Sequence, residues 1–258
     1  MGKKNFTDKT YGENEAVVSN IYDKIQRAYL TNSIVFTNEF CSPKISSVAK
    51  NLCSKIGVNF CAYGVFQDAE RCMLSFSLCE VENSKYPIDF LKISVKSKFC
   101  SLDHKDFLGS IMSLGIKREK YGDLILENDS CYVPVSIDIS DYVKSNLLKI
   151  KRESCSIKSI DILEDYVPNF KFQDILVIVT SDRLDSFVAS ICKISRNKSA
   201  DFIKSGNVQL NYSEIYEKDF KVSENDILTI RRYGKYKIYS FLGYTQKDRI
   251  KILIKKFA

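Results

Sequence analysis

Residues 181–211, SDRLDSFVASICKISRNKSADFIKSGNVQLN, constrain the fold most, because they predict two short helices followed by a strand. The first helix has apolar side chains at i, i+3, i+4 and i+7, namely Leu184, Phe187, Val188 and Ile191. That spacing places all four on one helical face, which must be buried against other elements. The stretch is therefore expected to form a compact helix pair packed on a sheet.

The ends of these elements are also readable. Ser181 or Asp182 is expected to cap the first helix, and Ser195 the second, because short polar side chains accept hydrogen bonds from the free N–H groups of a first turn. Gly206 is expected to end the second helix. The alternating residues 208–211 then predict a strand.

Positive charge is concentrated from this point onward. Residues 181–258 contain 16 lysines and arginines against 9 acids, a balance of +7, which equals the charge of the whole chain. Residues 1–180 are therefore electrically balanced. Charge segregated in this way indicates a polyanionic partner, and RNA is the first candidate.

The helix pair offers a place for phosphate. Arg196 and Lys198 lie in the first turn of the second helix, where free N–H groups and the positive end of the helix dipole favour an anion. Arg183 lies off the apolar stripe of the first helix and is expected to face solvent or a ligand, and Lys204 follows near the end of the second helix.

A second basic cluster follows at residues 231–237, RRYGKYK, after an Asn225-Asp226 turn and a strand at residues 227–230. Gly234 is expected to allow a bend. Cations bind phosphates and tyrosine rings stack on exposed bases, so the segment predicts an RNA-contacting hairpin. Its expected contact residues are Arg231, Arg232, Tyr233, Lys235, Tyr236 and Lys237.

The remaining pattern predicts an α+β protein of three parts. A small α/β domain (residues 1–83) is expected to have helices at 13–29 and 43–57 and strands at 58–65 and 72–79. A middle domain (84–165) has the order β-α-β-β-α-β, which is typical of split-βαβ folds of the ferredoxin-like or RRM-like type. Its strands are expected at 90–95, 123–127, 131–137 and 154–162, with helices at 104–114 and 140–150 and a hairpin turn at Asn128-Asp129. It lacks the RNA-reading signature of RRM domains, so we expect a packing or protein-contact role.

Residues 164–173 are expected to form a linker, and 174–180 a buried strand that leads into the basic module (181–258).

Several function classes are excluded by what the sequence lacks. The nine cysteines show no C-x-x-C pair and His104 is the single histidine, so neither a zinc site nor a disulfide framework is expected. No glycine-rich phosphate loop of the dinucleotide or P-loop type occurs. His104 precedes a helix and is expected to have a capping or surface role. We expect no cofactor or metal, and a cytosolic chain without a secretion signal or membrane span.

The basic module resembles the S-four RNA-binding domain, named after small-subunit ribosomal protein four. The residues that carry the resemblance are Arg183-Leu184-Asp185, Ser195-Arg196, Ala200, Ile203, Gly206, Val208, Leu210-Asn211 and Asp226-Ile227. Asn225 stands where the family usually has glycine, and asparagine tolerates the same left-handed turn. The resemblance implies that the helix pair grips structured RNA through Arg183, Arg196 and Lys198, with Asn211 also in the site.

Two further strings are similar to the hallmarks of YlmH-type proteins, bacterial proteins with a C-terminal S-four domain. They are residues 63–71, YGVFQDAER, and residues 108–123, LGSIMSLGIKREKYGD. The resemblance implies a non-enzymatic factor that binds ribosomal RNA of the large subunit and its tRNA, as a monomer, in rescue or quality control of stalled translation. Glu70, Arg71, Lys117 and Arg118 would then be candidate contacts to the ribosome or tRNA. Glu70 and Arg71 could equally form an ion pair that closes their loop.

Two alternatives stay open. Pseudouridine synthases also carry S-four domains and use an Arg-Leu-Asp segment with a nucleophilic aspartate, but Arg183-Leu184-Asp185 matches only those three letters. A protein-binding or division-associated factor would suit the balanced charge of residues 1–180.

Overall fold

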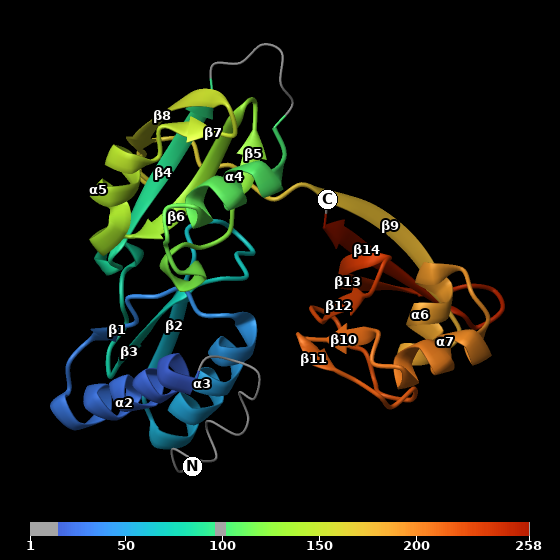
Figure 1. Cartoon of the computed structure of the whole chain (residues 1–258). Helices are drawn as coiled ribbons and strands as arrows, with labels where there is room; N and C mark the ends of the chain where they lie inside the picture. The colour runs from blue at the N-terminus through green and yellow to red at the C-terminus, as the bar shows by residue number, and fades with distance from the viewer. Residues whose placement is uncertain (1–14, 96–101, 258) are drawn as a thin grey trace. The chain divides into compact units, whose positions relative to one another are not determined.

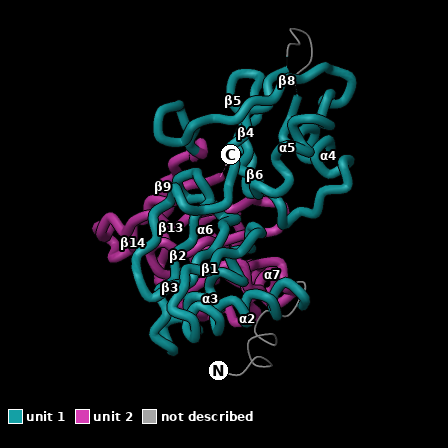
Figure 2. The backbone as a smooth tube through the Cα atoms, turned by 90° about the vertical axis from the view of Figure 1, so that its left-hand side faces the viewer, with its two compact units in different colours: residues 1–169 teal, residues 170–258 magenta. Residues whose placement is uncertain are grey.

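The computed structural model describes residues 15–95 and 102–257 (Figure 1). Residues 1–14, which include the first two residues of the predicted helix 13–29, and Cys100 lie outside the described residues. The chain forms two compact units, residues 1–169 and residues 170–258 (Figure 2). The predicted domain limits within residues 1–169 stay predictions.

The first unit begins with an N-terminal lobe, residues 15–81, in which two helices pack on a small antiparallel sheet. Its elements are α2 (Glu15–Thr31), β1 (Val35–Phe36), α3 (Pro43–Ile56), β2 (Asn59–Tyr63) and β3 (Met73–Ser77), and the strand order is β1-β3-β2. The apolar faces of both helices form one core with the sheet. Gly57 ends α3 with a left-handed φ of 74°, as its position predicted.

The middle lobe, residues 82–164, contains the second sheet of this unit. Its elements are η1 (Asn83–Lys85), β4 (Ile88–Val95), α4 (His104–Met112), η2 (Arg118–Lys120), β5 (Ile125–Glu127), β6 (Ser130–Ser136), α5 (Ile137–Asn146), β7 (Lys149–Ile150) and β8 (Glu153–Ser159). The order β5-β6-β4-β8-β7 places β6 between β5 and β4, which is the split-βαβ arrangement. Asn128 and Asp129 both have positive φ values, 46° and 58°, so the predicted hairpin turn is confirmed.

The helix expected at residues 140–150 was displaced. It begins at Ile137 and ends at Asn146, because Lys149 and Ile150 pair with Ser154 and Glu153 instead. The backbone of the last residues therefore finds its hydrogen bonds in the sheet rather than in a further helical turn.

The second unit is a six-stranded antiparallel sheet with two helices on one face (Figure 1). Its elements are β9 (Phe172–Val179), α6 (Leu184–Cys192), α7 (Arg196–Lys204), β10 (Val208–Leu210), β11 (Ser213–Glu214), β12 (Ile227–Ile230), β13 (Gly234–Tyr244) and β14 (Ile250–Phe257). The strand order is β11-β10-β12-β13-β14-β9. The apolar stripe of α6 lies in the core between the helices and the sheet. Helices and antiparallel sheets in both units confirm the α+β class.

The strand expected at residues 174–180 is longer and less buried than predicted. β9 starts at Phe172, inside the segment expected to be a linker, and among the described strands it pairs only with β14. Val177 and Val179 face the core, whereas Leu176 and Ile178 are 57% and 46% exposed. A continuous apolar run thus belongs here to an edge strand with one solvated face. Among the described residues, no helix is long and apolar enough to cross a membrane.

Candidate nucleic-acid interface

Two arginines of the second unit are held by one buried carboxylate. Asp185, 4% exposed, lies in the first turn of α6. Its oxygens accept hydrogen bonds from Arg183 Nε and Nη2, both at 3.2 Å, and from Arg196 Nη2 at 2.9 and 3.1 Å. The Arg183 and Arg196 side chains keep 36% and 48% exposure. Two cations that would otherwise repel each other are thereby fixed side by side at the surface.

Backbone hydrogen bonds to a neighbouring loop hold Asp185 in this position. The N–H groups of Leu184 and Asp185 donate to the carbonyls of Phe220 and Lys218, at 2.8 and 3.0 Å. The prediction that Ser181 or Asp182 caps α6 was therefore wrong: Arg183 stands at the cap position without a side-chain cap bond, because a neighbouring loop supplies the acceptors.

The start of α7 agrees with its prediction. The Ser195 hydroxyl accepts from the N–H of Lys198 at 3.3 Å, and Gly206 follows the helix with φ 71°. Ser199 is fully buried and donates to the carbonyl of Asp185 at 2.9 Å, which ties the two helices together. Lys198 and Lys204 lie exposed on α7.

The tip of the β12–β13 hairpin lies against the other end of α7. The N–H of Arg231 donates to the carbonyl of Asn207 at 3.0 Å, and the Tyr233 ring stands edge-on to Phe202 of α7 with centroids 6.2 Å apart. Arg232 has φ 71° and Gly234 φ 122°, so the bend predicted at Gly234 is confirmed. Arg231, Arg232 and Tyr233 therefore join the helix-pair site, which we define as Arg183, Arg196, Lys198, Lys204, Arg231, Arg232 and Tyr233.

Four predicted RNA contacts do not belong to this site. Tyr236 is 5% exposed and donates to the carbonyl of Tyr233, so its predicted stacking role was wrong: alternation along β13 turns this ring into the core. Lys235 and Lys237 point to the opposite face of the sheet for the same reason. Asn211 accepts from the N–H of Ile227 at 2.9 Å and donates to Asp226 at 2.8 Å, so its amide holds a turn.

The two hallmark strings of the first unit meet at Asp123. Its Oδ2 accepts from the backbone N–H groups of Glu70 and Arg71, at 2.6 and 3.0 Å. Burial raises the pKa of this carboxyl, and the two backbone hydrogen bonds oppose that rise. A Cβ on Gly64 would lie 2.5 Å from Ala69 Cβ, and one on Gly122 would lie 2.8 Å from Pro134 Cγ, so both positions are packed too tightly for a larger residue.

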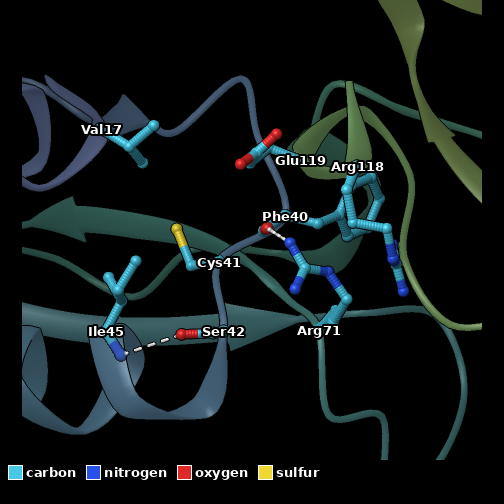
Figure 3. Close-up of a pocket in the computed structure, with 8 residues that line it drawn as sticks. All are labelled: Val17, Phe40, Cys41, Ser42, Ile45, Arg71, Arg118 and Glu119. Atoms are coloured by element: carbon cyan, nitrogen blue, oxygen red, sulfur yellow. Dashed lines mark hydrogen bonds between the residues drawn. The ribbon is translucent and has the colours of Figure 1, made fainter. Parts of the chain in front are cut away.

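Arg71 and Arg118 lie next to this joint and bond to carbonyls. Arg71 Nη2 donates to Phe40 O at 2.8 Å (Figure 3). Arg118 Nη1 donates to Tyr121 O at 2.6 Å, and the Arg118 guanidinium lies over the Tyr121 ring. Both arginines line a cavity of about 80 Å³, which Glu119 also lines. Burial, and then the nearby Arg71 charge, lower the pKa of Arg118. Lys117 is exposed beside them. Their ribosome or tRNA contact stays a prediction.

The helix-free face of the middle sheet is covered where RRM domains read RNA. Phe90 and Tyr132, on the two central strands, are 1% and 6% exposed. Phe66 of the first hallmark string stands edge-on to Phe90 at 5.4 Å. Bases therefore cannot stack on this pair in the RRM manner, which agrees with the missing signature.

His104 and the cysteines are the remaining side chains suited to nucleophilic chemistry or metal binding. His104 is exposed at the start of α4, which Asp103 and Asp106 cap. The cysteines among the described residues are free, and no group of three or more potential ligands that could hold a metal occurs there.

Comparisons with known proteins bear on the middle lobe and on the chain as a whole. Residues 82–164 match the family described as "Putative RNA-binding domain in YlmH". The chain is 27% identical over 220 residues to "Ribosome-associated protein quality control protein P2" of Bacillus subtilis, covering 84% of this chain and 86% of that protein. Among solved structures it is similar to "Cell division protein ylmH from Streptococcus pneumoniae", with 21% identity, a TM-score of 0.49, and coverage of 58% of this chain and 92% of that chain.

The family description gives residues 82–164 an RNA-binding role where we expected a packing or protein-contact domain. Together with the curated relative, it confirms the resemblance predicted from residues 63–71 and 108–123. The chain is thus similar to the YlmH-type proteins, and its middle lobe matches the RNA-binding domain of that family.

Proposed function

We propose that the chain is a non-enzymatic RNA-binding factor in ribosome-associated quality control, which binds ribosomal RNA of the large subunit and peptidyl-tRNA. The printed name of the Bacillus subtilis relative and the description of the middle-lobe family support the RNA-binding, quality-control role. The finer partners are proposed from the resemblance and from the geometry of the second unit.

The hydrogen-bonded cluster of Asp185 with Arg183 and Arg196, which we call the clamp, is the observation that supports the proposal most strongly. A buried carboxylate that orients two half-exposed guanidinium groups reduces the ordering cost of presenting them to a phosphate. Lys198 lies on the same helical turn as Arg196, and Arg231 and Arg232 lie beyond the other end of α7. The helix-pair site therefore forms a row of cations suited to an RNA backbone.

The excess positive charge of the second unit supports its having the main long-range attraction to RNA. Residues 82–164 contain 13 lysines and arginines and 13 acids, whereas residues 181–258 have a balance of +7. We infer that the second unit supplies the salt-dependent affinity and that the middle lobe adds contacts once the complex has formed.

Sedimentation tests this function. Purified full-length protein is mixed with separated ribosomal subunits and resolved on a sucrose gradient at low salt. We expect it to move with the large subunit, and to leave it progressively as salt rises, because phosphate contacts release counterions. Sedimentation only at the top of the gradient would contradict the ribosome assignment and favour the protein-binding, division-associated alternative.

The position of Asp185 argues against the pseudouridine synthase hypothesis. Both oxygens of Asp185 accept hydrogen bonds from guanidinium groups, and the residue is 4% exposed, so it cannot approach a base as a nucleophile. Incubation with total RNA followed by mapping of modified bases tests this directly. New pseudouridines that depend on the protein would overturn the non-enzymatic proposal.

A further inference from the structure

The sheet of the second unit has a face that its helices do not cover. α6 and α7 pack with Ile252 and Ile254 of β14, so the intervening residues of that strand point the other way. Residues directly opposite each other in antiparallel strands share a face, and the pairing extends this one onto β9 and β13. We name it the open face, and its residues on β14 are Lys251, Leu253, Lys255 and Phe257.

Lysines and aromatic rings alternate across one end of the open face. Lys255 Nζ lies 4.0 Å from the centroid of the Tyr239 ring and 5.7 Å from that of Phe172. Lys235 Nζ lies 5.5 Å from the Phe257 centroid and 5.2 Å from that of Tyr212. Phe172 and Phe257 stand edge to face at 5.0 Å. The rings are thus held at the surface beside cations instead of being buried.

The other end of the open face is hollow and basic. A depression of about 490 Å³ is lined by Ile178, Thr245, Gln246, Lys247, Arg249 and Lys251. The Thr245 hydroxyl accepts from the N–H groups of Lys247 and Arg249, which fixes the β13–β14 turn around it. Lys251 lies between this hollow and the aromatic rings at the other end of the open face. Residues 251–257 span about 20 Å of strand.

The charge of this surface limits what can cover it. Lys235, Lys237 and Lys255 lie near its rings, and Asp174 lies opposite Lys255 on the same face. At the hollow end, three cations stand against Asp248 of the turn. A cationic groove combined with aromatic platforms is the pairing that holds single-stranded nucleic acid, with phosphates on the cations and bases on the rings.

We propose that the open face is a second RNA site, separate from the helix-pair site, which binds an unpaired strand by stacking bases on Tyr239, Phe257 and Phe172. Its phosphates run past Lys235 and Lys255 toward the hollow at Lys251. The proposal extends the proposed RNA-binding function, which concerns structured RNA at the helix pair. One chain could then hold a folded RNA and a neighbouring single strand at once.

Matched variants of the full-length protein test the proposal with a fluorescent oligouridylate of roughly a dozen nucleotides, a length within the range of single-strand sites. Tyr239→Ala should weaken binding about five-fold or more, because a stacked base contributes about that much. The control Tyr244→Ala removes a ring from the same strand on the helix-side face and should leave affinity unchanged.

Charge is tested in the same assay. The double variant Lys235→Gln/Lys255→Gln should flatten the log–log salt slope by about 1.4, since each single-strand phosphate contact contributes roughly 0.7. Lys256→Gln, the neighbour of Lys255 on the other face, should not change the slope. Cross-linking with a 4-thiouridine probe should place RNA on Tyr239, Phe257 or Phe172.

Cross-links confined to α7, together with unchanged affinity in Tyr239→Ala and an unchanged salt slope in the lysine double variant, would overturn the proposal. Co-sedimentation of wild-type protein with the large subunit would still stand in that case, so failure of the open face and failure of the proposed function are separable. Circular dichroism of each variant confirms that the sheet is intact.

Discussion

Replacing Arg196 by glutamine should affect both RNA binding and folding, whereas replacing Lys198 should affect binding alone. The two residues lie in the same first turn of α7 and are both exposed to solvent. Only Arg196 contacts the buried Asp185, at 2.9 Å. The pair of variants therefore separates the role of the clamp from the role of positive charge.

The magnitudes follow from the burial of the two partners. Removing one partner of a fully buried ion pair costs about 3–5 kcal/mol. Arg196 is 48% exposed and Arg183 continues to pair with Asp185, so solvent screening reduces the cost. We expect Arg196→Gln to lower the free energy of unfolding by about 1–2 kcal/mol and Lys198→Gln to change it by less than about 0.5 kcal/mol.

Binding is measured against ribosomal RNA over a range of salt concentrations, and stability by urea denaturation. Five phosphate contacts give a log–log salt slope of about −3.5 to −4.5, and each variant should flatten it by about 0.7–0.9. An unchanged slope for Arg196→Gln would remove this residue from the contact set. Equal free energies of unfolding for the two variants would refute the claim that Arg196 stabilises the buried Asp185 carboxylate.

Two further predictions concern the first unit. Gly122→Ala should destabilise the fold by about 1–3 kcal/mol, because its Cβ would lie 2.8 Å from Pro134 Cγ; thermal denaturation checks this, and Gly109→Ala, with open space around its Cβ, should show no such loss. Burial raises the pKa of Cys53 to about 12, so the unfolded chain loses this proton near pH 9 while the folded chain keeps it. The free energy of unfolding should therefore fall as pH rises from 9 toward 12, by up to about 1.4 kcal/mol per pH unit for this thiol. Cys53→Ala should reduce that dependence and the exposed Cys79→Ala should not; urea denaturation at several pH values would contradict the reasoning if both variants behaved alike.

Local signals in the sequence predicted the elements well where one residue type was required by the backbone. Gly57 and Gly206 both have positive φ and follow the helices that the sequence places before them. Asn225 has φ 69°, so asparagine does replace glycine in that left-handed turn. Such positions depend on a few neighbouring residues, which is why sequence alone suffices for them.

The candidate site was harder to predict, because it depends on which face of the sheet a side chain occupies. Tyr233 and Tyr236 both lie among cations in the sequence, but Tyr233 is in the bend and Tyr236 is three residues further along a strand that alternates. Strict alternation would have placed Tyr236 opposite to Lys235 and Lys237. The same period of two places Lys251, Leu253, Lys255 and Phe257 on the open face, which was not predicted from the sequence.

The role of Asp185 could not be derived from spacing. An acid beside the apolar stripe of α6 is compatible with a solvated position, and its burial follows from the loop that supplies Lys218 O and Phe220 O. That loop comes more than thirty residues later in the chain. Long-range packing of this kind has no signature in a local pattern.

We propose that the second unit by itself carries the salt-dependent affinity for ribosomal RNA. Residues 170–258 form a compact unit with their own core, so they can be prepared as a separate fragment. Its binding to purified large ribosomal subunits should be readily detected in dilute buffer and should weaken steeply with added salt. Absence of any binding by the fragment in dilute buffer, under conditions where the full-length protein does bind, would contradict the account.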